Sequence, residues 1–389
     1  MVPDQQRGAG SCCTALLFLA AALCAVPSRA ALFVPRDDAE VVEQLRVRPL
    51  DRTDIEYRRQ RLLLRAAPDN LRLALAVARR SSEIARRDGD PRYLGYAQAA
   101  LLPWWSLAEP APAVRLLRAN ILQSTHQFPA ALQELSQVLR AEPGNAQAWL
   151  TQASIYQVQG RYAEARASCQ ALPALGASQY AEGCLAEIAG LTGQPREARA
   201  RLDALIRSSP AMEWLAIVQA ELAERSGDFV AAEGFFRSAL SATPDAYCKA
   251  AYADFLLDRR RFREVVNLLQ YEQRADALLL RLALAYSALR DPAADASVAA
   301  LRARFDAAQL RGDSAHRREQ ARFTLQLLQQ PQAAVILALA NWQVQKEPAD
   351  ARVLLEAARA AKQPGAAVAV RAFIHAQGWT DQRLLSYMQ

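Results

Sequence analysis

This 389-residue chain has little of what interrupts helices or builds sheets. It contains only 15 glycines, and aromatic residues make up only 7% of it. Its hydrophobic fraction of 52% is dominated by alanine and leucine rather than by valine and isoleucine. Such a composition excludes a collagen-like or disordered chain. It favours helices that pack through small side chains over β-sheet.

Blocks of like charge are lacking as well. The chain has 47 basic and 40 acidic residues, for a formal net charge of +7. Arginines and acids alternate at helical spacing, which is typical of a solvated helix face. A nucleic-acid surface would need a basic block with interleaved aromatics, and the sequence has none. We therefore expect no nucleic-acid partner.

Groups that could converge on a reaction are scarce. The three histidines, His126, His316 and His375, lie far apart in the sequence. No motif for nucleotide binding, a catalytic metal, a redox dithiol or an activated nucleophile occurs. His126 falls in an expected turn between helices, where we expect it to be solvated. The sequence predicts no catalytic residue, no metal and no cofactor.

One long apolar run is present, and it lies at the start. Residues Thr14–Val26 are uninterrupted by charge, follow Arg7, and end at Pro27. The run is shorter than the roughly 20 residues that span a bilayer. Small residues at Ser28 and Ala30 suit a signal peptidase. We expect cleavage after Ala30, export to the periplasm and no later membrane span; an uncleaved anchor is the alternative.

Prolines recur with a regular period. Successive spacings along Pro68, Pro110, Pro143, Pro210 and Pro244 are 42, 33, 67 and 34 residues. The third spacing is two periods with one proline missing. A period near 34 residues with a proline stop predicts a repeat architecture.

Within one period the local signals define two helices. Asn145 can cap a first helix over 146–159, in which the small Ala153 stands between bulky residues. Gly160 ends that helix. Tyr162 and Ala165 then open a second helix. This order of an aromatic, a small residue, a tyrosine, a glycine, an aromatic and an alanine resembles the tetratricopeptide repeat.

The second-helix phrase recurs along the chain. It begins at Phe128, Tyr162, Pro195, Phe229 and Phe262, each followed three residues later by alanine or valine. The resemblance covers 113–270, about five repeats. It implies an all-α, right-handed superhelical α-solenoid of antiparallel helix pairs.

The flanks fit the same plan. We predict a signal peptide at 1–30, an extended segment at 31–52, and a capping helix with a degenerate repeat at 53–112. Tetratricopeptide repeats follow at 113–270, then degenerate helical repeats at 271–389. The amphipathic segment Phe373–Met388 is expected to cap the C-terminal end, because a terminal repeat otherwise exposes its apolar face.

Three consecutive repeats carry an aromatic residue and, seven residues later, an acid. Seven residues are almost two helical turns, so each pair shares a helix face. The resemblance places these first helices along a concave groove. There the six residues would bind an extended or helical peptide through its apolar and basic side chains. The alternative is that the aromatics pack between repeats while the acids pair with arginines such as Arg225. We call these six residues the aromatic–acidic ladder: Tyr180, Glu187, Trp214, Glu221, Tyr247 and Asp254.

Three cysteines remain after the signal segment. Their spacing is not that of a metal site. Cys169 on a second helix and Cys184 on the following first helix should be adjacent. A disulfide can form if their Cα atoms lie within about 7 Å; two buried thiols are the alternative. Cys248 is then left over and expected to be buried.

Taken together, these features predict a non-catalytic protein–protein interaction scaffold or adaptor in the bacterial envelope. Its protein or peptide partner would bind in the concave groove. The alternative is a periplasmic holder or receptor for a small ligand or extended polymer. An enzyme would need a non-helical domain, and every long segment keeps helical periodicity.

Overall fold

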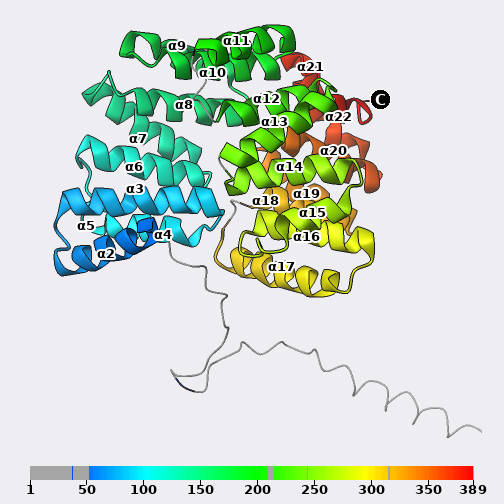
Figure 1. The fold of residues 1–389 in the computed structure, drawn as a ribbon, viewed down its shortest axis with the longest axis horizontal. Helices are drawn as coiled ribbons and strands as arrows, with labels where there is room; N and C mark the ends of the chain where they lie inside the picture. Colours follow the sequence, from blue (N-terminus) through cyan, green and yellow to red (C-terminus); the bar gives the residue numbers. More distant parts are fainter. Residues whose placement is uncertain (1–36, 38–51, 209–213, 243, 314–315, 389) are drawn as a thin grey trace, which may run out of the picture. The chain divides into compact units, whose positions relative to one another are not determined.

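The computed structural model describes residue 37 and residues 52–208, 214–242, 244–313 and 316–388. The helices form the compact unit Arg52–Gln389 (Figure 1). All regular elements in the described residues are helices. In chain order they are α2 (Arg52–Ala66), α3 (Leu71–Asp88), α4 (Arg92–Ala100), α5 (Leu102–Trp105), α6 (Pro112–Ser124), α7 (Phe128–Ala141), α8 (Ala146–Val158), α9 (Tyr162–Gln170), η1 (Pro173–Leu175), α10 (Ser178–Leu191), α11 (Pro195–Ser208), α12 (Leu215–Arg225), α13 (Phe229–Ala242), α14 (Ala246–Asp258), α15 (Phe262–Leu269), α16 (Asp276–Leu289), α17 (Ala293–Leu310), α18 (Arg317–Gln326), α19 (Pro331–Trp342), α20 (Pro348–Ala360), η2 (Pro364–Ala367), α21 (Val368–Gln377) and α22 (Gln382–Leu385).

Local signals explain a typical helix pair, α8 with α9. The side chain of Asn145 accepts a hydrogen bond from the backbone N–H of Ala148 at 3.0 Å, which satisfies a free donor at the start of α8. Ala153 on α8 and Ala165 on α9 are fully buried, and their small side chains let the two helices approach closely. Gly160 takes a positive φ of 71° between them, where a β-carbon would be strained.

The same turn joins a first to a second helix throughout the described repeats. Its central residue has positive φ, and the next backbone N–H bonds back into the first helix, as Arg161 does to Tyr156 at 2.8 Å. Nine such residues occur, 30 to 39 positions apart. They are Gly89, His126, Gly160, Gly193, Gly227, Arg260, Arg290, Gln329 and Lys362.

Helix pairs therefore continue well beyond the segment in which the motif is readable. The predicted all-α solenoid of antiparallel helix pairs is confirmed. Proline residues start or precede second helices in the C-terminal region, at Pro292, Pro331 and Pro364.

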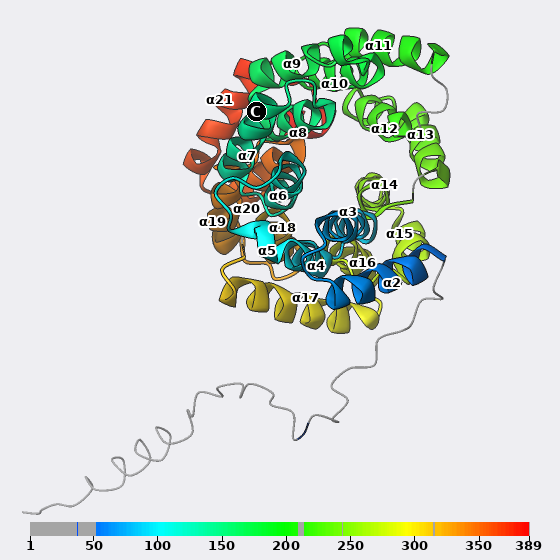
Figure 2. The same cartoon turned by 90° about the vertical axis from the view of Figure 1, so that its left-hand side faces the viewer.

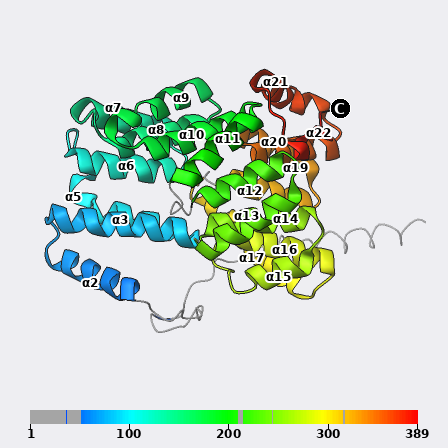
Figure 3. The same cartoon turned by 45° about the horizontal axis from the view of Figure 1, so that its top comes forward.

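Helices far apart in the sequence meet because the unit winds back on itself. Figure 2 shows the helices passing around a ring. Helix α3 packs against α14, and α12 packs against α22. Figure 3 shows α3 extending toward the light-green helices that include α14. The C-terminal helices thus share a core with the early repeats, in which Tyr162 packs in one cluster with Trp342 and Trp379.

The turns of the early repeats lie directly against later helices. A β-carbon at Gly160 would come within 2.4 Å of the Phe373 ring, and one at Gly193 within 2.4 Å of the Gly378 carbonyl oxygen. The backbone N–H of Lys346 donates to the carbonyl of Val158 at 2.8 Å. These glycines are thus required by space as well as by φ. We call this set of contacts the turn contacts.

The expected C-terminal cap over Phe373–Met388 is not one helix. Helix α21 ends at Gln377, Gly378 has a φ of 67°, and the short α22 follows. The break occurs where Gly378 meets Gly193 in the turn contacts. This segment therefore packs against the early repeats instead of only covering the last one.

Candidate partner-binding face

The aromatic–acidic ladder lies on α10, α12 and α14, which are first helices of three consecutive repeats. Tyr180 and Glu187 lie within α10 and Tyr247 and Asp254 within α14, while Trp214 immediately precedes α12. The structure brings several of these side chains together across helices, and it separates the ladder into two parts.

Trp214 packs between repeats. Its ring stacks on Tyr180 with ring centroids 6.4 Å apart and an interplanar angle of 7°. Its indole also lies over Gly183, where a β-carbon would come within 2.2 Å of the ring. Gly183 thus makes room for Trp214. Tyr180 keeps 47% of its surface exposed.

Tyr247 and Glu221 form one hydrogen-bonded unit that joins α14 to α12. The Tyr247 hydroxyl donates to Oε1 of Glu221 at 2.5 Å. The negative charge of Glu221, together with burial of the hydroxyl, raises the pKa of Tyr247 well above its usual value. Oε2 of Glu221 lies 3.6 Å from a guanidinium nitrogen of Arg225. Even so, 55% of the Tyr247 surface remains exposed.

Glu187 is half-buried, and among the described residues no arginine or lysine forms an ion pair with it. Burial raises its pKa, and the nearby carboxylates of Glu221 and Glu347 raise it further. A hydrogen bond from the Gln157 side chain and the positive charge of Arg225 act in the opposite direction, but the net shift is upward. A cation placed beside Glu187 would relieve this unfavourable charge.

Asp254, in contrast, forms ion pairs that join helices of the protein to one another. It accepts hydrogen bonds from Arg281 on α16 and from Arg322 on α18, both at 2.6 Å. Burial opposes the charge of Asp254, but the two guanidinium groups outweigh it and hold the pKa well below its ordinary value. This carboxylate therefore links three first helices and is already neutralised.

The packing alternative describes part of the ladder, and the partner-binding interpretation stays a prediction for the rest. Trp214 and Asp254 pack and pair within the protein, and Glu221 lies next to Arg225 as the packing alternative foresaw. Tyr180 and Tyr247 remain about half exposed, and Glu187 lies close enough to Glu221 and Tyr247 for their charges to interact. The part that is available to a partner, called here the open ladder, is Tyr180, Glu187, Glu221 and Tyr247.

Sequence reasoning misplaced His126. The expectation that it is solvated is wrong, because the ring is partly buried beside Phe128 and one ring nitrogen lies 3.0 Å from Nε2 of Gln345. Burial lowers its pKa to about 4. No local signal could reveal this contact, since its partner lies 219 residues away.

The cysteines fall where the helix pairing puts them. Cys169 and Cys184 have Cα atoms 6.1 Å apart and are joined as a disulfide between α9 and α10 in the structure. Cys248 is free and buried. Across the described part of the chain, no cluster of three or more histidine, cysteine, aspartate or glutamate side chains is arranged to hold a metal ion. None of the described helices has the length and apolarity needed to cross a membrane.

Comparison with known families identifies the repeat. The family model described as tetratricopeptide repeat matches residues 116–180 and 185–247. These segments lie within the part in which the sequence motif is readable. No curated protein is significantly similar to the chain.

Several solved structures are distantly similar. The APC/C hetero-tetramer Cut9–Hcn1 has 12% identity and a TM-score of 0.39, and the match covers 87% of this chain and 52% of that one. This chain thus spans about half the length of that protein. A tetratricopeptide repeat protein from Parabacteroides merdae has 14% identity, a TM-score of 0.37 and coverages of 62% and 98%. A human IFIT1 dimer with PPP-AAAA has 13% identity, a TM-score of 0.41 and coverages of 84% and 67%. Scores this low support no conclusion about partners.

Proposed function

This chain is a tetratricopeptide-repeat protein, and on that premise we propose that it is a non-catalytic scaffold that holds a protein or peptide partner. The binding surface in this proposal is the open ladder on the first helices α10, α12 and α14. The family relation supports a protein-interaction role only in general terms.

One observation carries the proposal: two half-exposed tyrosines share the first helices α10 and α14 with a carboxylate on α10 that has no ion pair among the described residues. Tyr180 and Tyr247 offer apolar ring surface with a polar edge, which suits partner recognition. Glu187 offers a partly desolvated negative charge. A peptide segment with apolar side chains next to a lysine or arginine complements both features.

The test compares partners captured from a periplasmic extract by the mature protein and by variants. Tyr180→Ala combined with Tyr247→Ala, and separately Glu187→Lys, should each weaken capture of the partner at least about tenfold. Tyr271→Ala, on a tyrosine that is 78% exposed outside the ladder, serves as the matched control. Asp254 is left intact because it holds the framework together.

An unchanged set of partners with both ladder variants would contradict this surface. Capture of a small ligand or a polymer instead of a protein, lost in the same variants, would favour the holder or receptor alternative.

We also propose that the protein is exported to the bacterial periplasm and acts there as an envelope adaptor. The support is the apolar run and the small residues before Ala30, which lie outside the described residues. The intact mass of the protein recovered from a periplasmic fraction should correspond to a chain that begins at residue 31. A full-length chain recovered only with membranes would instead establish a retained anchor.

A further inference from the structure

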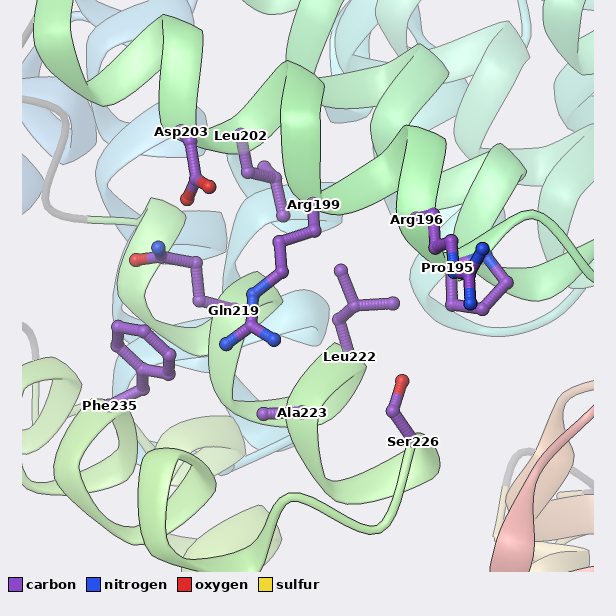
Figure 4. Close-up of a pocket in the computed structure, with 10 residues that line it drawn as sticks. All are labelled: Pro195, Arg196, Arg199, Leu202, Asp203, Gln219, Leu222, Ala223, Ser226 and Phe235. Carbon is purple, nitrogen blue, oxygen red and sulfur yellow. The ribbon is translucent and has the colours of Figure 1, made fainter.

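A pocket of about 190 Å³ opens between the second helices α11 and α13, with the first helix α12 as its floor (Figure 4). It does not include any residue of the ladder. Its apolar surface comes from Leu202, Leu222, Ala223 and Phe235. Pro195 and Ser226 lie together at one end of it.

The position of the pocket follows from the repeat register. Pro195 stands two residues after the turn residue Gly193, where four other repeats have an aromatic residue. Ser226 stands one residue before the next turn residue, Gly227. In the following repeat interface the same two positions are Phe229 and Arg259.

The next repeat interface shows which side chains occupy the positions equivalent to Pro195 and Ser226. The guanidinium of Arg259 lies over the ring of Phe229, 4.1 Å from its centroid. A small proline and a small serine replace that ring and that cation at the α11–α12 interface. The pocket is therefore the space that an aromatic ring occupies one repeat later.

The size of the pocket agrees with this interpretation. An apolar cavity of about 150 Å³ lined by leucine, isoleucine and phenylalanine side chains accepts a benzene ring. The pocket is somewhat larger and open, and two of its lining residues, Leu202 and Leu222, are almost fully buried. One aromatic side chain from outside can enter it.

Two arginines, Arg196 and Arg199, line the opening of the pocket. Arg199 extends across the centre of the pocket in Figure 4. Its carboxylate neighbour, Asp228, lies 3.5 Å away, and both side chains are largely exposed, so the pair is weak. Arg196 is exposed, and within the described residues no ion pair involves it.

The position of Asp203 favours one orientation of a charged ligand in the pocket. Asp203 lies beside Gln219, away from the end formed by Pro195 and Ser226. An acidic group of a ligand is repelled near Asp203 and attracted near Arg196. The favourable orientation places the ring in the pocket and the carboxylate at the Arg196 end.

We propose that this pocket is a second docking site, which binds an aromatic side chain of a protein partner that has an acidic residue next to it. The ring packs on Leu222 and against the guanidinium of Arg199, as Phe229 packs against Arg259. The adjacent carboxylate pairs with Arg196. The site lies on second helices, so it can be occupied together with the open ladder.

The experiment measures fluorescence anisotropy with a labelled octapeptide that carries one phenylalanine followed by two aspartates in a glycine–serine background. Replacing its phenylalanine by alanine should weaken binding to the mature protein at least about tenfold. Replacing its aspartates by lysines should weaken binding by a similar factor.

Protein variants locate the site. The double variant Pro195→Phe with Ser226→Arg installs the ring and cation of the neighbouring interface, so it should abolish peptide binding while keeping the thermal midpoint or raising it. Arg196→Glu, a surface change that leaves packing intact, should weaken binding about tenfold or more. Arg207→Glu, also exposed on α11 but outside the pocket, is the charge control and should change binding less than about twofold.

Peptide binding that survives the pocket-filling variant, or that is equally weakened by Arg207→Glu, would overturn the proposal. So would binding of phenylalanine amide alone without any gain from the acidic peptide. The open-ladder variant with Tyr180→Ala and Tyr247→Ala should bind the peptide normally, which separates this site from the proposed function.

Discussion

The repeats of 113–270 and those that follow them share a turn but differ in the residue that starts the second helix. Two residues after the positive-φ position, most of the earlier repeats have an aromatic, as at Phe128 and Tyr162. The later repeats have proline at the same place, as at Pro292, Pro331 and Pro364. Proline suits the first turn of a helix because its missing N–H is not needed there.

This difference between aromatic and proline shows that the residue at the start of the second helix has two separate roles. Starting the second helix requires a residue compatible with helical φ, and proline does this without a large side chain. Filling the space against the next repeat requires a ring. Pro195 is a proline of the later type inside the readable repeats, and the pocket of about 190 Å³ lies there. The turn, and not the aromatic, is therefore the constant feature of this solenoid.

The largest expected effect comes from breaking the turn contacts without changing a second-helix start. Gly193→Ala places a β-carbon 2.4 Å from the carbonyl oxygen of Gly378 and also strains a φ of 75°. Because the obstacle is backbone, we expect a loss of about 3 kcal/mol or more in the free energy of unfolding. Urea unfolding followed by circular dichroism measures it.

Gly176→Ala is the matched control for that change. Gly176 has a similar φ of 73°, but no atom lies within 4 Å of its would-be β-carbon. It should therefore lose only the backbone part, about 1 kcal/mol. Equal losses for the two variants would show that contact with Gly378 contributes nothing.

A smaller loss should follow when the junction between the two groups of repeats is altered. Asp254→Asn leaves Arg281 and Arg322 facing a neutral amide, and we expect a loss of about 2–3 kcal/mol in the free energy of unfolding. Because the pKa of Asp254 is depressed, this stabilisation is present above the ordinary carboxylate pKa and is lost as the pH falls below it.

Glu264→Gln provides the comparison for Asp254. Glu264 pairs with Arg261 at 2.6 Å, but 47% of its side chain is exposed. An exposed pair contributes less than about 1 kcal/mol, so this variant should be nearly neutral. A loss as large as that of Asp254→Asn would contradict the inference that Asp254 stabilises the fold by pairing with Arg281 and Arg322.

The sequence could predict features that depend on near neighbours. These features each depend on residues within one helical hairpin. They are the cap at Asn145, the glycines with positive φ, buried alanines such as Ala153, and the prolines at helix starts. These features suffice to predict the fold class and the helix pairs. The sequence could also place Tyr180 and Glu187 on one face, because both lie on one helix.

Contacts between distant repeats could not be predicted in this way. Asp254 carries the same local signal as Glu221, yet Arg322 neutralises it from 68 residues away. His126 looked like any turn residue, yet Gln345 reaches it once the unit winds back on itself. The winding depends on small rotations added over many repeats, and no single repeat records their sum.

A local link within the readable repeats offers a contrast to these distant contacts. The Cys169–Cys184 bond closes 15 residues between α9 and α10. Reduction should cost up to about 3 kcal/mol by chain entropy, and less if the packed helices already restrict the loop. Thermal melts with and without reductant measure the loss, with Cys248→Ala as a background that removes the free thiol. Full alkylation of Cys169 and Cys184 in the unfolded protein without reductant would show that the bond does not form.

The smallest expected effect concerns the pH dependence of the contact between His126 and Gln345. In the folded protein burial lowers the pKa of His126 to about 4, assisted by Arg318 and His316 and opposed by Glu319 and Glu347. In the unfolded chain its pKa is about 6.5. Between these values the unfolded state binds the additional proton, so stability falls as the pH falls from about 6.5 to about 4 and then levels off.

Protonation also removes the ring acceptor that faces the Gln345 amide, so the contact between an early turn and the segment that joins α19 to α20 weakens in the same window. His126→Asn keeps a residue that tolerates positive φ and removes the titration. We expect the wild-type and variant stability profiles to diverge by about 1–2 kcal/mol over this pH range, discounted for partial exposure. His375→Asn, at an exposed histidine on α21, is measured alongside as the comparison variant. Parallel profiles for wild type and His126→Asn would mean that the imidazole is solvated in the folded protein and that its contact with Gln345 contributes nothing.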